Sequence, residues 1–194
     1  ELIRRALVRG YRAIGVTDHV GTGNVEYVVK TLVVDCANGT NRWDILAMPG
    51  VEITHVPKDD IDLVARTAKE LGAKLVTVHG ETIVEPVEPG TNEAAVRSAF
   101  VDVLAHPGLI SYEVARLAAE NGVYLEISAR KGHSLANGHV VNMARQAGAA
   151  TVLDSDAHEP DDLLTLDLID KIAEGAGLNK EEAHALLKTN PQNL

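Results

Sequence analysis

Val76-Thr77-Val78-His79-Gly80 is an apolar run that ends in a histidine and a turn residue. Val103-Leu104-Ala105-His106-Pro107-Gly108 repeats this arrangement further along the chain. Short runs rich in Val, Ile and Leu are typical of parallel strands that are covered on both faces. The two stretches therefore predict neighbouring buried strands, each of which ends in a histidine.

Apolar runs of this kind recur along the whole chain. The predicted strands are Ala13 to Thr17, Ile45 to Met48 with Val51 to Ile53, Lys74 to Val78, Val101 to Ala105, Val123 to Ile127 and Ala150 to Leu153. Between them, apolar residues spaced three and four apart predict amphipathic helices, several of which end at a glycine such as Gly72 or Gly122. The spacing from one strand end to the next fits one βα unit with short loops.

Polar residues at the strand ends decide which fold these βα units form. A doubly wound sheet concentrates its site at one switch point, whereas a barrel gathers the ends of all its strands on one rim. Nearly every predicted strand closes on a candidate ligand: Asp18-His19, Glu52, His79, His106, Glu126 and Asp156-His158. The sequence thus predicts an α/β, TIM-like barrel that spans residues 1-194 as one domain and carries a metal site on its rim.

Composition limits the partners and the location that we expect. The net charge is −10 and no long run of Lys or Arg is present, so a large nucleic acid or an anionic membrane is a poor partner. Cys36 is the only cysteine, which excludes an internal disulfide and a thiolate cluster and fits a cytoplasmic location. No apolar stretch approaches the ~20 residues that span a bilayer.

Four strand-end features carry the metal hypothesis, and one of them is Asp18-His19 at the end of the first predicted strand. A carboxylate such as Glu52 in an apolar strand is costly to bury unless it binds a cation or a hydrogen-bond donor, although a strand-end glutamate can also simply reach solvent. His79 or His106 alone is more often a turn histidine, but as a pair on neighbouring strands they favour ligation. Asp156 and His158, two apart, can face one site, whereas a lone aspartate there could merely cap a helix.

Other residues are weaker candidates. An arginine beside a metal site suits bidentate capture of a phosphate or carboxylate, and a structural salt bridge is the alternative for it. His55, shortly after Glu52, is either a site residue or an ordinary loop residue. The weaker candidates with an expected role are Glu126, Arg130 and His133.

Six stretches together resemble the ordered motifs of the PHP (polymerase and histidinol phosphatase) domain superfamily. They are Gly15-Val16-Thr17-Asp18-His19, Pro49-Gly50-Val51-Glu52-Ile53, Val78-His79-Gly80, Leu104-Ala105-His106-Pro107-Gly108, Leu125-Glu126-Ile127-Ser128 and Ser155-Asp156-Ala157-His158. The resemblance runs from about residue 11 to 160. It implies a distorted (β/α)7 barrel, up to three divalent metal ions and a phosphoesterase activity.

The resemblance also implies a role for each ligand. Glu52 would bridge two metals, and His79 and His106 would complete the second of them. Asp156 would serve the first metal, and His19 with His158 would serve the third.

The opening of the chain departs from this pattern. Glu1 to Arg9 reads as a helix without an initiator Met, and no strand precedes it. The resemblance places a His-x-His motif on a first strand that we expect to be missing from these 194 residues. Either the natural protein is longer, or part of the site has been lost.

The expected chemistry is hydrolysis by a metal-activated hydroxide, because a bound divalent ion lowers the pKa of its water toward neutrality. Arg130 and Glu126 would contact the substrate, and Asp18 or His133 would protonate the leaving alcohol. Histidine and carboxylate ligands suit Zn, Mn or Fe.

Three functions remain open at this point. The first is a phosphatase acting on a small-molecule phosphate ester, histidinol phosphate being the substrate in the superfamily's name. The second is a phosphodiesterase or nuclease acting on nucleotides or short oligonucleotides. The third is a non-catalytic barrel subunit of a ribonucleoprotein, which the acidic charge and the retained ligands disfavour. The oligomeric state is open, and a homo-oligomer is among the alternatives.

Overall fold

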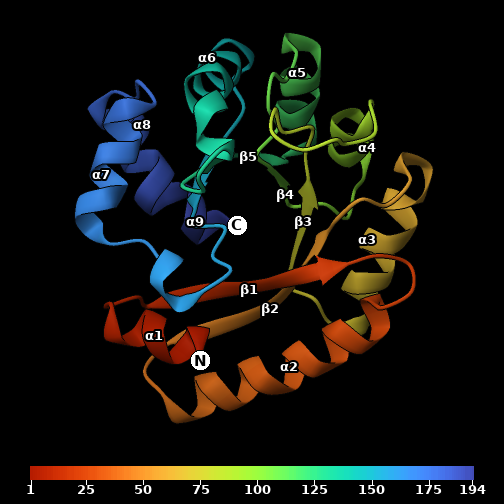
Figure 1. Ribbon diagram of the computed structural model, residues 1–194, viewed down its shortest axis with the longest axis vertical. Coiled ribbons are helices and arrows are strands. Elements are labelled where there is room, and N and C mark those ends of the chain that lie inside the picture. The colour runs from red at the N-terminus through yellow and green to blue at the C-terminus, as the bar shows by residue number, and fades with distance from the viewer.

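Six parallel strands form the centre of the computed structural model, which describes residues 1–194 (Figure 1). They are β1 (Ala13–Val20), β2 (Leu46–Ile53), β3 (Leu75–His79), β4 (Val103–Ala105), β5 (Tyr124–Ser128) and β6 (Thr151–Asp154). Each strand pairs with the next in the order β1-β2-β3-β4-β5-β6. The sheet curls into a half-barrel, so the α/β barrel-type prediction is confirmed in this coarser form, while the count of seven units is not.

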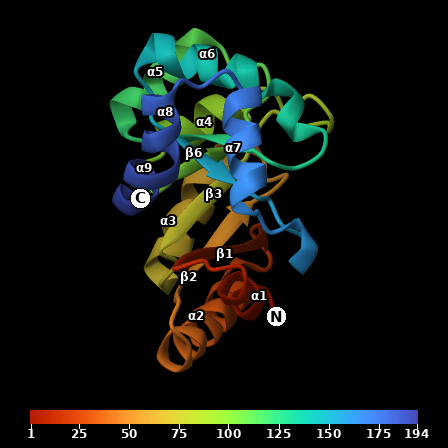
Figure 2. The same ribbon diagram turned by 90° about the vertical axis from the view of Figure 1, so that its left-hand side faces the viewer.

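Helices cover the convex face of the sheet, as Figures 1 and 2 show from two sides. They are α1 (Leu2–Val8), α2 (Val25–Arg42), α3 (Ile61–Leu71), α4 (Thr91–Arg97), α5 (Tyr112–Asn121), α6 (Asn137–Ala147), α7 (Leu166–Gly175), α8 (Lys180–His184) and α9 (Asn190–Asn193). Short helical turns span Lys58–Asp60, His133–Ala136, Pro160–Asp162 and Ala185–Thr189. Helices α3, α5 and α6 end at left-handed Gly72, Gly122 and Gly148, as expected where a residue without Cβ caps a helix.

Two strands are longer than predicted, and the other four differ from their predicted bounds by one or two residues. β1 continues to Val20, so Asp18 and His19 lie within the strand and not after it. β2 runs unbroken through Pro49 and Gly50, because the sheet tolerates a proline where its missing N–H is not required by the neighbouring strand.

Alternation along the strands separates an apolar face from a polar one. In β2, Val51 and Ile53 belong to the buried core cluster, and Glu52 between them points to the opposite face. In β5, Leu125 and Ile127 likewise pack into that core. The convex face therefore packs against the helices, while the concave face collects buried polar side chains: Glu52, Thr77, His79, Glu126 and Ser128.

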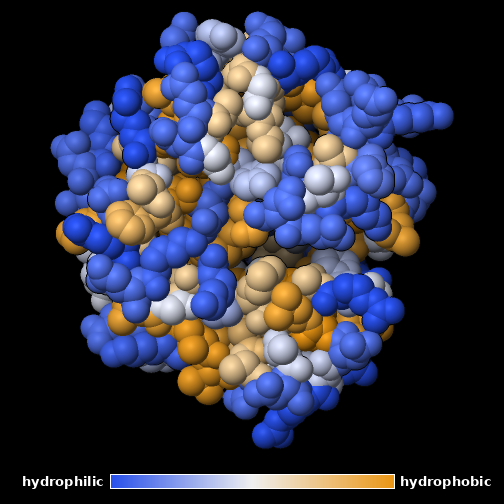
Figure 3. Space-filling view, turned by 180° about the vertical axis from the view of Figure 1, so that it is seen from behind, coloured by the Kyte–Doolittle hydropathy of each residue, from blue (hydrophilic) through white to orange (hydrophobic).

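The outer surface is mostly polar. Figure 3 shows one face of the molecule on which hydrophilic side chains dominate and hydrophobic ones gather in the central and lower part. None of the helices combines the length and the apolar character that crossing a bilayer requires.

Gly108 fixes the turn that follows β4. Its φ is +59°, and a Cβ at this position would collide with the backbone carbonyl of Glu81. Gly122 has a similar φ of +73°, but a Cβ there would meet nothing within 4 Å. An alanine at Gly122 would therefore incur only backbone strain, whereas an alanine at Gly108 would incur both backbone strain and a steric collision.

We predict that Gly108→Ala lowers the free energy of unfolding by roughly 2–4 kcal/mol, the sum of a left-handed backbone penalty and an overpacking penalty. Gly122→Ala, which carries only the backbone penalty, should cost about 1 kcal/mol. Urea unfolding of both variants measures the difference. Equal losses would show that the Gly108 turn can move away from Glu81.

Candidate metal centre

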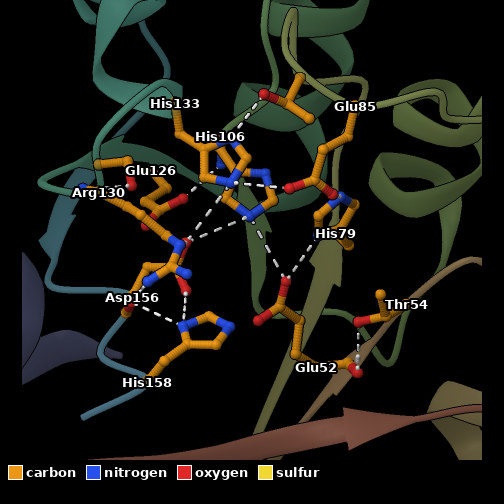
Figure 4. A network of polar contacts seen from close by, with 12 residues as sticks. Glu52, Thr54, His79, Glu85, His106, Glu126, Arg130, His133, Asp156 and His158 are labelled. Carbon is orange, nitrogen blue, oxygen red and sulfur yellow. Dashed lines mark hydrogen bonds and ion pairs between the residues drawn. The ribbon is translucent and has the colours of Figure 1, made fainter.

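The Glu52 side chain lies at the centre of the site, with imidazoles on either side of its carboxylate (Figure 4). Its Oε1 atom is 3.1 Å from Nδ1 of His79 and 3.5 Å from Nε2 of His106. Its Oε2 atom is 3.6 Å from Nε2 of His19. His19 is the register partner of Glu52 on β1, and His79 ends β3. Parallel register thus brings residues from separate strands to one carboxylate.

Asp156 forms a second centre after β6. Its Oδ2 atom is 3.9 Å from Nε2 of His106 and 3.8 Å from Nε2 of His133. Its Oδ1 atom is 3.4 Å from Nδ1 of His158. The rings of His106 and His133 are stacked with centroids 4.1 Å apart, so both imidazoles present Nε2 toward the same carboxylate. Glu52 and Asp156 therefore each use their two oxygens toward different histidines.

Backbone strain is concentrated at this site. His55, His106 and Asp156 are the non-glycine residues with positive φ, at 52°, 27° and 46°. Such conformations cost of order 1–3 kcal/mol each and persist where the surrounding structure holds them. In the core behind the site, residues such as Leu104 and Leu125 are completely buried and supply that support.

The charges of the site stabilise one another only in part. Burial raises the pKa of Glu52, but hydrogen bonds from His106, His19 and His79 outweigh it and hold the pKa well below its usual value. Burial and the charge of Glu52 raise the pKa of Asp156. Burial, with His106 nearby, lowers the pKa of His133 to about 4. The site therefore favours an ionised Glu52 and a neutral His133 near pH 7.

Glu126 lies behind the cluster of histidines and carboxylates. It is 2% exposed, and one of its oxygens accepts a hydrogen bond from the backbone N–H of His106. Burial and the charges of Asp154 and Asp156 raise its pKa well above the usual value. The contact in the structure is thus with the protein backbone, and the substrate contact expected for Glu126 stays a prediction.

Arg130 lies at the edge of the site, and Asp18 lies outside it. The Arg130 Nη1 atom donates to the backbone carbonyl of Asp156 at 3.2 Å, and its Nε lies 3.7 Å from the Asp156 carboxylate. The carboxylate of Asp18 accepts a hydrogen bond from the N–H of His19 and is exposed. Successive strand residues point to opposite faces, so Asp18 points away from the cluster that His19 faces.

Two residues outside the predicted set also lie at the site. Glu85, in the loop after β3, places Oε2 3.2 Å from Nε2 of His79 and 3.9 Å from Nε2 of His55. Thr82 in the same loop places its hydroxyl 2.6 Å from Nδ1 of His133. Neither residue ends a strand or follows a helical period, so no pattern in the sequence indicated them.

The donor atoms suit divalent cations. Three sets have their ligand atoms within 4.8 Å of one another: Glu52, His79 and His106; His106, His133 and Asp156; and His55, His79 and Glu85. The first set is fully buried. Imidazole nitrogen and carboxylate oxygen without thiolate fit zinc, manganese or iron. Nε2 of His79 and Nδ1 of His106 are buried without a hydrogen-bond partner, so the protein alone leaves the site incompletely satisfied.

Comparison with known sequences finds one relative that is 43% identical and others that are 25–31% identical. A protein of Methanocaldococcus jannaschii, named as uncharacterized protein MJ1295, is 43% identical over all of this chain and 89% of its own length. A probable phosphatase of Shewanella halifaxensis is 31% identical over 70% of this chain, which spans 59% of that protein. A probable phosphatase of Thermoanaerobacter sp. is 25% identical over 93% of this chain and 80% of its own length.

Comparison with solved structures reports on the fold. A chain in the cryo-EM structure of archaeal ribonuclease P with mature tRNA superposes with a TM-score of 0.68 at 17% identity, over 96% of this chain and 86% of that one. A prolidase complexed with N-methylphosphonate-L-proline gives a TM-score of 0.57 at 12% identity, over 95% and 64% of the two chains. At these identities the likeness concerns the fold alone.

No family model matches the sequence. Membership of a family therefore rests on the full-length relative, which aligns with this chain from end to end at 43% identity. The chain belongs to the same protein family as MJ1295 of Methanocaldococcus jannaschii.

Proposed function

We propose that this chain is a metal-dependent phosphoesterase of the PHP type and that it acts on a small phosphomonoester. The observation that carries the proposal is the buried set Glu52, His79 and His106, whose donor atoms lie within 4.8 Å of one another. The relatives from Shewanella halifaxensis and Thermoanaerobacter sp. that are named probable phosphatases support the same reaction class.

The proposed metal ligands are grouped around two carboxylates, those of Glu52 and Asp156. Glu52, with one oxygen toward His79 and His106 and the other toward His19, has the arrangement of a ligand shared between ions. Asp156, with one oxygen toward His158, would serve a neighbouring position. Divalent ions in these positions would act as Lewis acids and would make a hydroxide nucleophile available near neutral pH.

Other side chains of the chain would handle the substrate. Arg130 is one-third exposed beside Asp156 and would bind a phosphoryl oxygen. Because its pKa is lowered to about 4, His133 is neutral near pH 7, so it would offer a lone pair to a metal and would not donate a proton to the leaving alcohol. Asp18 points away from the cluster, and we no longer propose it as the proton donor. We propose that solvent protonates the leaving alcohol.

Charge favours a small substrate over a polynucleotide. A net charge of −10 repels a phosphate backbone, whereas a single phosphate group can be held locally by metals and one arginine. The alternative is a phosphodiesterase, which the same ligands could serve.

Matched hydrolysis assays with p-nitrophenyl phosphate and bis(p-nitrophenyl) phosphate distinguish the phosphomonoesterase from the phosphodiesterase. Faster cleavage of the diester would overturn the monoester proposal.

Glu52→Gln keeps the shape of the side chain but removes its charge, so we predict at least a tenfold loss of phosphatase activity, a barrier increase of ~1.4 kcal/mol or more. The number of tightly bound ions, measured by elemental analysis after dialysis, should also fall. Glu70→Gln on the exposed surface of α3 is the control and should change neither quantity. A Glu52→Gln variant with more than about a tenth of the activity would exclude a shared ligand.

Arg130→Lys retains the charge but loses the planar fork, so we predict that it raises KM for a phosphate ester and that Arg130→Ala raises KM further. Steady-state kinetics of both variants provide the measurement. If KM and kcat stay at their original values in both, Arg130 serves only to hold the Asp156 loop through its contact with the Asp156 carbonyl.

A further inference from the structure

We propose that Glu85 is a positioning residue of the metal centre: when an ion replaces the hydrogen bond from His79 to Glu52, Glu85 accepts the Nε2–H of His79 and thereby keeps the Nδ1 lone pair of that ring directed at the ion that Glu52 also binds. The inference rests on the metal-dependent function proposed above. It extends that function to a residue in the loop after β3 that no strand-end pattern includes.

The His79 ring lies between two carboxylates (Figure 4). Nδ1 is 3.1 Å from Oε1 of Glu52, and Nε2 is 3.2 Å from Oε2 of Glu85. A neutral imidazole carries one proton, so a ring with its proton on Nε2 presents a lone pair at Nδ1. Nε2 of His79 is buried and has no other polar partner, which leaves Glu85 as the acceptor for that proton.

The 3.2 Å separation is within hydrogen-bond range, but the two groups are not aligned for a hydrogen bond. The His79 side chain is only 5% exposed and cannot turn, whereas the Glu85 side chain is 41% exposed and can. A rotation of Glu85 therefore closes the contact. A carboxylate that accepts the second N–H of a ligating histidine fixes its tautomer and raises its basicity toward the metal.

A competing role for Glu85 is direct ligation of an ion with His55 and His79. That role requires the Nε2 lone pair of His79, whereas the buried Glu52 set uses the Nδ1 lone pair of the same ring. One neutral imidazole offers only one lone pair to a cation. The Glu52 set is fully buried, whereas the His55 and Glu85 side chains are exposed. We therefore assign the lone pair of His79 to the Glu52 set, and Glu85 remains as the acceptor for the Nε2–H of His79.

The loop that carries Glu85 is held in place from both sides. The Glu81 carboxylate accepts the backbone N–H groups of Gly90 at 3.0 Å and Asn92 at 2.9 Å, which closes the base of the loop. The Thr82 hydroxyl contacts Nδ1 of His133 at 2.6 Å. These contacts fix the backbone from which Glu85 reaches His79, as positioning requires.

Metal affinity tests the proposal without any substrate. Titration of the metal-free protein with Zn²⁺ should show that Glu85→Ala weakens binding at the Glu52 set by roughly 10–100-fold while the number of bound ions stays the same. Glu85→Gln, which keeps a carbonyl acceptor, should restore part of the loss. Glu88 lies in the same loop as Glu85 and forms an ion pair with Lys58. Glu88→Gln removes that ion pair and is the matched control, which we expect to leave the zinc affinity unchanged.

The tautomer of His79 provides a second readout that a merely structural role would not move. In the ¹⁵N spectrum of histidine-labelled, zinc-loaded protein, the signals that His79→Gln removes belong to this ring. They should report a protonated Nε2 in the original protein, with faster solvent exchange of that proton in Glu85→Ala.

Three results would overturn the proposal: equal zinc affinity in Glu85→Ala, an equal loss in Glu88→Gln, or loss of one whole ion in both Glu85→Ala and His55→Asn, which would make Glu85 a ligand. Original protein that binds zinc but hydrolyses no phosphate ester would refute the proposed function and leave the role of Glu85 measurable. Original protein that binds no zinc would refute both.

Discussion

The burial of one carboxylate constrains the whole concave face. Glu52 is 7% exposed, and an isolated buried charge costs several kcal/mol unless opposite charge or hydrogen-bond donors surround it. Imidazoles from β1, β3 and the end of β4 provide those donors, and they can meet only because parallel strands end at the same rim. The apolar convex face and its helices fix that register, so the core and the site depend on each other.

Strain at the rim follows from the same arrangement. His106 adopts positive φ so that its side chain turns inward directly after β4, where a regular strand would carry it outward, and Asp156 adopts positive φ in the turn after β6. The backbone N–H of His106 then donates to buried Glu126, which compensates part of the strain. Glu126 thus supports a ligand from below, a role that its place at a strand end could not distinguish from substrate contact.

The strands and the polar side chains at their ends were predictable from the sequence because both follow from period-two alternation and parallel topology. His79, His106 and Glu52 close their apolar runs and meet as expected. Asp18 was misplaced because β1 extends further than predicted, so Asp18 continues the alternation of the strand and points away from the face that His19 shares with Glu52. Glu85 lies in a loop without periodicity, and its approach to His79 depends on how that loop folds back, which no local pattern encodes.

The fold alone does not distinguish a hydrolytic centre from a structural barrel. The TM-score of 0.68 to a chain of an archaeal ribonuclease P complex concerns the path of the backbone, and one backbone supports many unrelated activities. What distinguishes a hydrolytic centre from a structural barrel is whether inward-facing positions retain groups that are unfavourable unless they bind a cation. This chain keeps two carboxylates and several imidazoles there, with His79 Nε2 and His106 Nδ1 unsatisfied, and carries a net charge of −10. A barrel selected only to assemble with RNA would gain stability by replacing those groups with apolar ones and affinity by adding basic residues, so the retained donors favour catalysis.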